Sequence, residues 1–194
     1  MMNMKNHYFI LRHGETIYQQ EKKDIIYPFP EKEPIDLTEK GRKQIKKATQ
    51  RLKKEKIDII FSSDITRCRQ SAEIVAKELK LNVNFDKRLR DVNLGIYHGK
   101  TKAEFYKDFP DLKKRFVQKP KRGESWNEVK KRMLSFIKEI DKRHKNKNIL
   151  IVSHGDPLWL LEGAMKGLRR NEEYFEQGKK IIPQTGELRK LKLK

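Results

Sequence analysis

The stretch Tyr8–Thr16, YFILRHGET, joins four apolar residues directly to an arginine, a histidine and a glycine. A short apolar run rich in β-branched and aromatic residues is typical of a strand that is buried on both faces of a parallel sheet. Residues 57–61 and 149–152 have the same character. Helical patterns lie between these runs, so the sequence predicts an α/β protein. We expect a three-layer sandwich with a mostly parallel central sheet flanked by helices.

Four amphipathic segments are expected to form these helices. Their apolar positions recur every three or four residues: Ile45, Ala48 and Leu52 after an N-cap at Thr38; Cys68, Ala72, Val75 and Leu79; Trp126, Val129, Met133, Phe136, Ile137 and Ile140; and Leu158, Leu161 and Met165. Residues 186–194 alternate like an edge strand whose lysines face water. Residues 87–124 lack a clear period, and we expect a lid-like insertion around residues 96–122. Residues 1–194 are predicted to form a single domain.

The chain is strongly basic. Its 194 residues include 47 Lys and Arg against 27 Asp and Glu, a formal charge of +20. These cations are spread along the sequence, which is typical of solvated helix faces and does not favour nucleic acid as the main partner. A basic surface also attracts phosphorylated substrates.

The compartment is predicted from absences in the sequence. Cys68 is the only cysteine, so no intramolecular disulfide can form, and a reducing compartment fits best. No run approaches the roughly 18 apolar residues that a membrane span needs. The N-terminal residues lack the apolar segment of a signal peptide. The sequence therefore predicts a cytoplasmic protein with no membrane partner.

Chemically active side chains follow each of the three expected strands. Arg12 and His13 follow the first, two serines and then Arg67 follow the second, and His154 follows the third. In open α/β sheets, ligands bind just beyond the carboxyl ends of the strands. One strand-terminal histidine is usually structural, but two His-Gly pairs with two arginines predict a common site for an anion.

Six segments, in this order, resemble successive motifs of one family. They are LRHGET (11–16), DLTEKGRKQ (36–44), FSSDITRCRQSAEIVAKEL (61–79), LRDVNLGIYHG (89–99), GESWNEVKKRM (123–133) and IVSHGDPLWLL (151–161). The set resembles the histidine phosphatase superfamily, in the branch of cofactor-dependent phosphoglycerate mutases and related small phosphatases. The resemblance implies a phosphoglycerate mutase-like fold.

The resemblance also implies the roles of individual residues. His13 is the nucleophile that becomes phosphorylated, Arg12 and Arg67 hold the phosphoryl oxygens, and His154 donates a hydrogen bond to the same group. Asp91 falls on the acid/base position. General chemistry supports this set, because an imidazole can attack phosphorus and arginine forks match phosphoryl oxygens bidentately. The cations supply the positive charge, so no metal or other cofactor is expected.

The chain departs from the family pattern at two places. The family commonly has Glu where this chain has Asp91, so Glu124 is kept as an alternative acid/base. After RHGET, residues 17–36 are longer than usual and lack the family's Asn and its Arg-x-x-Gly stretch. Thr16 is expected to contact the phosphate, and Gln19 to replace the missing Asn. This altered loop suggests a substrate other than phosphoglycerate.

Three functions remain open at this level. The first is a metal-independent phosphatase that hydrolyses phosphomonoesters of small molecules or proteins through phosphohistidine on His13. The second is a cofactor-dependent phosphoglycerate mutase-type phosphotransferase. The third is a non-catalytic binder of nucleic acid or another polyanion, which would not need a paired-histidine site. The substrate and the oligomeric state are not determined by the sequence.

Overall fold

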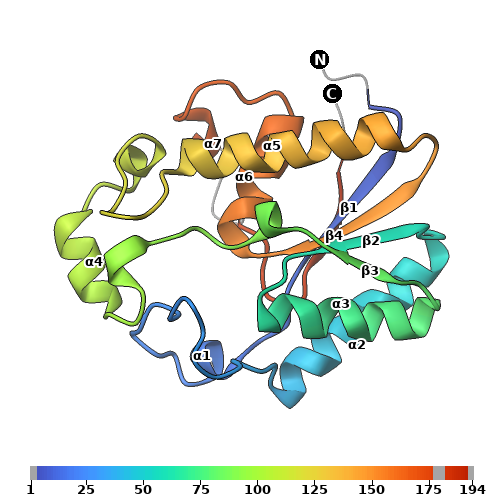
Figure 1. Ribbon diagram of the computed structural model, residues 1–194, viewed down its shortest axis with the longest axis horizontal. Helices are drawn as coiled ribbons and strands as arrows, with labels where there is room; N and C mark the ends of the chain where they lie inside the picture. The colour runs from blue at the N-terminus through green and yellow to red at the C-terminus, as the bar shows by residue number, and fades with distance from the viewer. Residues whose placement is uncertain (1–3, 177–181, 192–194) are drawn as a thin grey trace.

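The computed structural model describes residues 4–176 and 182–191. At its centre is a five-stranded sheet in the order β3-β2-β4-β1-β5 (Figure 1). The strands are β1 (His7–Arg12), β2 (Ile59–Ser62), β3 (Val83–Phe85), β4 (Asn148–Ser153) and β5 (Leu188–Lys190). β5 pairs antiparallel with β1, and the other pairs are parallel. The predicted mostly parallel sheet is confirmed.

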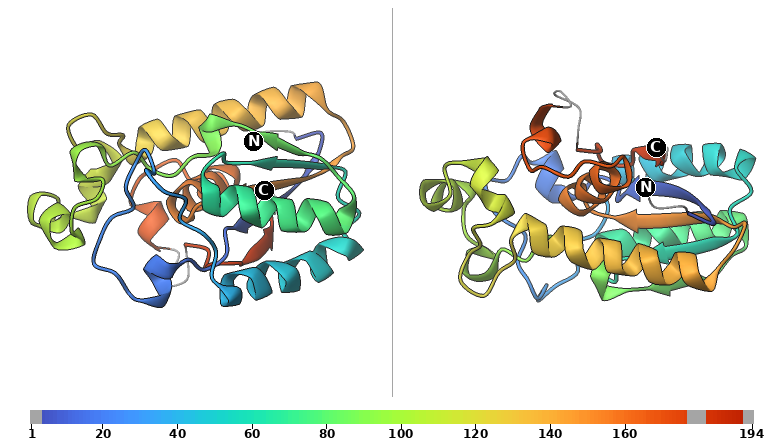
Figure 2. Two further views of the ribbon diagram at one scale, coloured as in Figure 1. Left: turned by 60° about the horizontal axis from the view of Figure 1, so that its bottom comes forward. Right: turned by 90° about the horizontal axis from the view of Figure 1, so that it is seen from above.

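Helices cover both faces of the sheet. α2 (Glu39–Lys54) and α3 (Thr66–Leu79) lie on one face, and α5 (Trp126–Arg143) and α6 (Gly155–Met165) lie on the other (Figures 1 and 2). Because successive strand residues point to opposite faces, Tyr8 and Ile10 pack with α5 and α6, whereas Phe9 and Leu11 pack with α2 and α3. The three-layer sandwich is therefore confirmed, with one hydrophobic core on each side of the sheet.

Local signals explain where the main helices begin. Thr38 Oγ1 accepts a hydrogen bond from the Gly41 N–H at 3.0 Å, which caps α2 as expected. Ser125 and Glu128 form a capping box at the start of α5. Pro157 lies in the first turn of α6, where the missing N–H has no helical acceptor to lose.

The segment between β3 and α5 contains only short helices. They are η1 (Lys87–Leu89), η2 (Gly95–Tyr97), α4 (Lys102–Asp108) and η3 (Leu112–Phe116). Two further short helices are α1 (Ile17–Gln20) and α7 (Glu173–Glu176). The action of residues 96–122 as a lid stays a prediction, as does the assignment of residues 1–194 to one domain.

Strand boundaries differ slightly from the sequence prediction. β2 begins at Ile59 and not at residue 57, and the three-residue strand β3 was not predicted because it has no apolar run of its own. β5 is an edge strand as expected, but it covers only Leu188–Lys190. The predicted strand also included residues 192–194, which lie outside the described residues.

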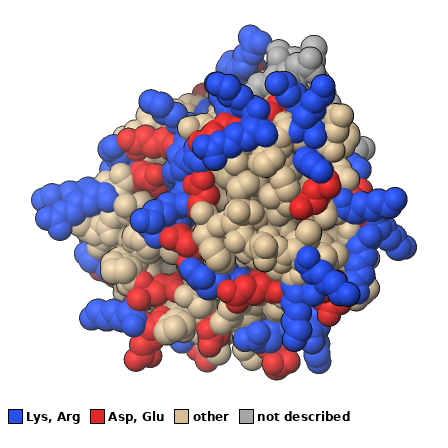
Figure 3. Space-filling view, turned by 45° about the vertical axis from the view of Figure 1, so that its right-hand side comes forward, with Lys and Arg blue, Asp and Glu red and all other residues tan. Residues whose placement is uncertain are grey.

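Charge is interleaved on the surface. On the face in Figure 3, Lys and Arg side chains surround an uncharged central area, with Asp and Glu between them. Among the described residues, no helix combines the length and apolarity that crossing a membrane requires.

Candidate active site

The two strand-terminal histidines lie at one edge of the sheet. β1 and β4 are parallel neighbours, and Arg12 pairs in register with Ser153, so the next residue of each strand leaves the sheet at the same level. The rings of His13 and His154 have centroids 5.4 Å apart at an interplanar angle of 63°. Both are buried, with 2% and 0% exposure. The convergence expected from the sequence is therefore present.

His13 is held in one tautomer. Its Nδ1 lies 2.8 Å from the carbonyl oxygen of Gly14. Because a carbonyl can only accept, Nδ1 carries the proton and Nε2 carries the lone pair. Burial, together with the charges of Arg67 and Arg12, holds the pKa of His13 well below its usual 6.5. The ring is thus neutral near pH 7 and has the electron pair that a nucleophile needs.

A close backbone contact fixes the turn that carries His13. A Cβ on Gly14 would lie 2.5 Å from the carbonyl oxygen of Gly41 in α2, which leaves no room for a side chain. The Gly14 N–H also donates to Ser71 Oγ in α3 at 3.1 Å. Two helices therefore anchor this turn.

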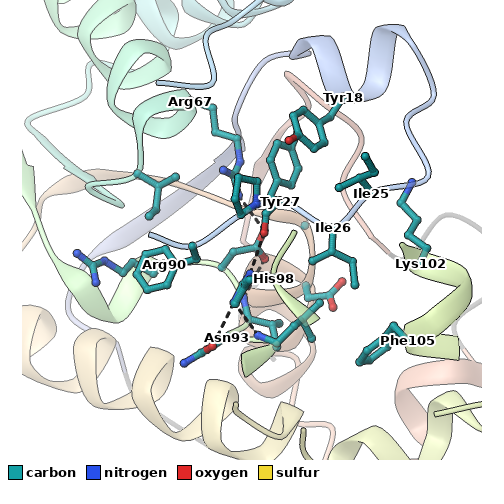
Figure 4. Close-up of a pocket in the computed structure, with 18 of the residues that line it drawn as sticks. Tyr18, Ile25, Ile26, Tyr27, Arg67, Arg90, Asn93, His98, Lys102 and Phe105 are labelled. Atoms are coloured by element: carbon teal, nitrogen blue, oxygen red, sulfur yellow. Dashed lines mark hydrogen bonds and ion pairs between the residues drawn. The ribbon is translucent and has the colours of Figure 1, made fainter. Parts of the chain in front are cut away.

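Arg67 is the most fully held cation of the site. It lies at the start of α3 with 2% exposure, and its guanidinium stacks 4.0 Å from the centre of the Tyr27 ring (Figure 4). Nη1 donates to Glu31 Oε1 at 3.0 Å, and Nη2 donates to Asp91 Oδ2 at 3.1 Å.

Both arginines retain an unused donor. Arg12 Nη1 donates to the Pro183 carbonyl at 2.8 Å. The buried Nε of Arg12 and that of Arg67 have no hydrogen-bond partner among the described residues. Buried N–H groups are nearly always hydrogen-bonded. Both donors are therefore available to an oxyanion.

His154 contacts three side chains of the site. Its Nε2 lies 3.0 Å from Ser63 Oγ and 3.4 Å from Cys68 Sγ, and its Nδ1 lies 3.5 Å from Asp91 Oδ2. Burial and the nearby charges of Arg67 and Arg12 hold the pKa of His154 well below 6.5. Cys68 is buried on α3 as expected, and burial raises the pKa of its thiol. Its contact with His154 was not foreseen.

The two acid/base candidates have different surroundings. Asp91 is 38% exposed and reaches both Arg67 and His154. Glu124 lines the same cavity, but its oxygens accept from Arg132 Nε at 2.9 Å and from the Asn93 N–H at 3.0 Å. Asp91 is therefore the carboxylate that lies beside the predicted anion site, while Glu124 is held by Arg132.

Thr16 and Gln19 are bonded to each other and to Tyr27. Thr16 Oγ1 donates to Gln19 Oε1 at 2.9 Å and lies 2.6 Å from the Tyr27 hydroxyl oxygen. Gln19 Nε2 donates to the same hydroxyl at 2.6 Å. The structure thus connects both residues to Arg67 through the Tyr27 ring. Their contact with phosphate stays a prediction.

Sequence reasoning missed Tyr27 and Glu31. Both lie in the segment between α1 and α2 that departs from the family pattern, and both contact Arg67. The departure showed that the segment is individual, but no local spacing identifies which of its residues turn inward.

A cavity of about 830 Å³ is lined by Arg12, Arg67, Tyr27, Glu31 and Asp91, whereas His13, His154 and Thr16 are not among its lining residues. Arg67 and Tyr27 lie at one end of the cavity, which we call the anion end, and Ile25, Phe105 and Lys102 lie away from them (Figure 4). Within residues 4–176 and 182–191, no three His, Cys, Asp or Glu side chains are grouped so that they could hold a metal ion.

The chain is similar in sequence to known proteins. The sequence profile of the histidine phosphatase superfamily (branch 1) matches residues 8–179. Phosphoserine phosphatase 1 of Hydrogenobacter thermophilus is 32% identical over 138 residues, which is 69% of this chain and 65% of that enzyme's length. Phosphoglycerate mutase-like protein 4 of Arabidopsis thaliana is 32% identical over 84% of this chain and 73% of its own length.

A solved structure extends the likeness to three dimensions. YhfR of Bacillus stearothermophilus has a TM-score of 0.79 and 28% identity, covering 94% of this chain and 89% of that one. The phosphoglycerate mutase-like fold expected from the sequence is confirmed. With the profile spanning most of its length, the chain belongs to branch 1 of the histidine phosphatase superfamily.

Proposed function

We propose that this protein is a phosphatase that hydrolyses phosphomonoesters through a covalent phosphohistidine on His13, without a metal. The observation that carries the proposal is one cluster: the buried neutral imidazole of His13, whose Nε2 carries the lone pair, near Arg12 and Arg67, whose Nε groups have no hydrogen-bond partner among the described residues. The curated relative named as a phosphoserine phosphatase supports a hydrolytic reaction on a phosphorylated small molecule.

The first half-reaction transfers the phosphoryl group to the enzyme. The Nε2 electron pair of His13 forms a bond to phosphorus while the ester P–O bond breaks. Arg12, Arg67 and His154 stabilise the charge on the phosphoryl oxygens, which is the main requirement of phosphoryl transfer. Asp91, entering as the carboxylic acid, gives its proton to the leaving alkoxide.

The second half-reaction releases phosphate. Asp91, now a carboxylate, takes a proton from a water molecule as its oxygen attacks phosphorus, and the P–N bond breaks so that its electron pair returns to His13. The 38% exposure of Asp91 gives water a route to this carboxylate. That route favours hydrolysis over a mutase, which must keep water away from its phosphoenzyme. We place this activity in the cytoplasm because the chain has a single, buried cysteine.

The test is hydrolysis of p-nitrophenyl phosphate in the presence of a chelator. Wild type should turn over, and His13→Ala should lose about 10⁴-fold or more in kcat because no other group replaces the nucleophile. His7→Ala, at the exposed start of β1, is the matched control and should keep full activity. Rapid quenching should trap one acid-labile phosphoryl group on wild type and none on His13→Ala.

Two results would redirect the assignment. Near-wild-type turnover by His13→Ala would show that His13 is not the nucleophile. Conversion of 3-phosphoglycerate to its 2-phospho isomer with added 2,3-bisphosphoglycerate, at a rate above that of phosphate release, would identify a mutase.

A further inference from the structure

Two segments far apart in the sequence join to form one side of the cavity. The Ile26 N–H donates to the Lys100 carbonyl at 2.8 Å, and the Gly99 N–H donates to the Ile26 carbonyl at 3.1 Å. The Lys102 N–H donates to the Asp24 carbonyl at 3.1 Å. We call residues 24–29 and 98–106 the cavity wall. These backbone bonds make it one continuous surface, in which Tyr27 lies at the anion end and Ile25, Lys102 and Phe105 lie away from that end (Figure 4).

The cavity wall presents apolar side chains to solvent. Ile25, Phe29 and Tyr106 line the cavity with 40%, 39% and 47% exposure. Behind them, Ile26 and Phe105 are buried and also line it. Large apolar side chains that remain exposed together around one concavity usually mark a ligand site, since exposure costs hydrophobic free energy.

The arginines that line this cavity outside the anion end already have carboxylate partners. Arg90 forms two hydrogen bonds with Asp64, at 2.6 and 2.5 Å. Arg132 is paired with Glu124 at 2.9 Å, and Arg115 lies 3.7 Å from Asp156. Recognition of a small acid by one of these arginines would have to break its pair. The apolar surface is available without such a cost. The cavity lining also includes Lys22, Lys23, Lys87 and Lys102.

The size of the cavity agrees with a large ligand. About 830 Å³ lies in the upper part of the range of roughly 300 to 1,000 Å³ that holds drug-sized molecules. A phosphorylated three-carbon acid would leave most of this volume to water.

We infer that the cavity wall binds the apolar or aromatic body of the leaving alcohol, so that the preferred substrates are phosphomonoesters of large apolar alcohols and not of three-carbon acids. This inference rests on the proposed function. The phosphate lies at the anion end, against Arg67, and the alcohol extends along Ile25, Phe29 and Tyr106. Burial of that body supplies binding energy that a small hydrophilic ester lacks.

Binding can be measured without turnover. Phenylphosphonate and biphenyl-4-ylphosphonate carry a C–P bond that is not hydrolysed and differ by one ring. Titration calorimetry on the wild-type chain should give a Kd at least about tenfold lower for the biphenyl compound, as expected from the apolar area of one ring. Equal affinities would overturn the inference.

Matched variants locate the subsite. Ile25→Ser and Tyr106→Ser should each reduce the biphenyl-to-phenyl affinity ratio by about threefold or more. Leu112→Ser is the control, because Leu112 is 39% exposed but does not line the cavity. Circular dichroism checks that each variant is folded. An unchanged ratio in both wall variants, or an equal loss in Leu112→Ser, would contradict the location.

Hydrolysis separates this inference from the proposed function. The substrates are 4-phenylbutyl phosphate and 3-phosphoglycerate. The leaving group of each ester is an alkoxide. We expect kcat/KM at least about tenfold higher for the phenylbutyl ester. Hydrolysis of both esters at equal efficiency would overturn the substrate class and leave the phosphatase intact. If the protein binds the biphenyl compound selectively but shows no hydrolysis that depends on His13, the proposed phosphatase activity would be wrong and the apolar subsite would stand.

Discussion

The reacting groups and the cavity wall are built on different principles. His13 and His154 are almost completely buried, are not among the residues that line the cavity, and follow adjacent parallel strands. In the cavity wall, Ile25 and Tyr106 are 40% and 47% exposed and belong to loop and short-helix segments joined by backbone bonds. The sheet therefore fixes the positions of the reacting groups, while the loops form the surface that contacts the variable part of a ligand.

The largest effect expected from a test of this difference concerns Asp91, which contacts Arg67 and His154. Asp91→Asn should lower kcat for alkyl phosphates by about 10² to 10⁴-fold, because the alkoxide then leaves without a proton. The first step with p-nitrophenyl phosphate should be affected far less, since that leaving group needs no proton, and phosphoenzyme should accumulate. Rapid-quench kinetics with both esters makes the measurement. An equal loss with both would show that Asp91 does not protonate the leaving group.

The next largest effect is expected from replacing Arg67, which tests whether phosphate binding requires a guanidinium. Arg67→Lys should lower kcat/KM for p-nitrophenyl phosphate by about 10² to 10³-fold, because an ammonium cannot replace the planar fork. Arg69→Lys, two residues along α3 where the side chain stacks on Phe85, is the matched control. Steady-state kinetics on both variants decides the point. Comparable losses would indicate damage to α3 and not loss of a phosphate contact.

A smaller effect is expected where the loop reaches into the anion end. Glu31 is 10% exposed and places its carboxylate 3.0 Å from Arg67 Nη1, which offsets part of the positive charge offered to phosphate. Glu31→Gln should therefore tighten competitive inhibition by inorganic phosphate about tenfold. Glu33→Gln, on the same loop but exposed, should leave the inhibition constant unchanged. Weaker phosphate binding in Glu31→Gln would instead make Glu31 a group that positions Arg67.

The smallest expected effect is on stability, and it comes from the burial that distinguishes the reacting groups. The pKa values of His13 and His154 are lowered in the folded protein, so the unfolded chain binds more protons below pH 6.5. Their contribution to stability is present above pH 6.5. It is lost as pH falls below that value, by about 1.4 kcal/mol per pH unit for each histidine.

Urea unfolding at pH 7 and pH 5.5, in phosphate-free buffer, measures this slope. His154→Gln should reduce the pH dependence because one buried titrating group is removed. His7→Gln, at an exposed position, should leave it unchanged. Equal slopes in all three proteins would contradict the role of the buried ring.

Most of the fold could be predicted because local pattern encodes it. Apolar runs of four residues predicted β1 and β4, and three- and four-residue spacing predicted α2, α3, α5 and α6. The three-residue strand β3 could not be predicted, because Val83–Phe85 is half-buried or exposed at the sheet edge and shows no apolar run. Its pairing depends on β2 being in place beside it.

The meeting of Arg12, His13, Arg67 and His154 could be predicted from the sequence alone. Arg12 ends β1, His13 and His154 directly follow β1 and β4, and Arg67 lies in the first turn of α3, the helix after β2. The carboxyl ends of these parallel strands share one edge of the sheet. The residues around them became known only from the folded structure: Glu31 and Tyr27 contact Arg67, Cys68 contacts His154, and residues 24–27 are bonded to residues 98–102. The two kinds of information differ in the range of the interactions that carry them. A buried strand is indicated by the apolar character of neighbouring residues. The contacts around Arg67 and His154 instead involve loops whose conformations depend on the rest of the folded chain.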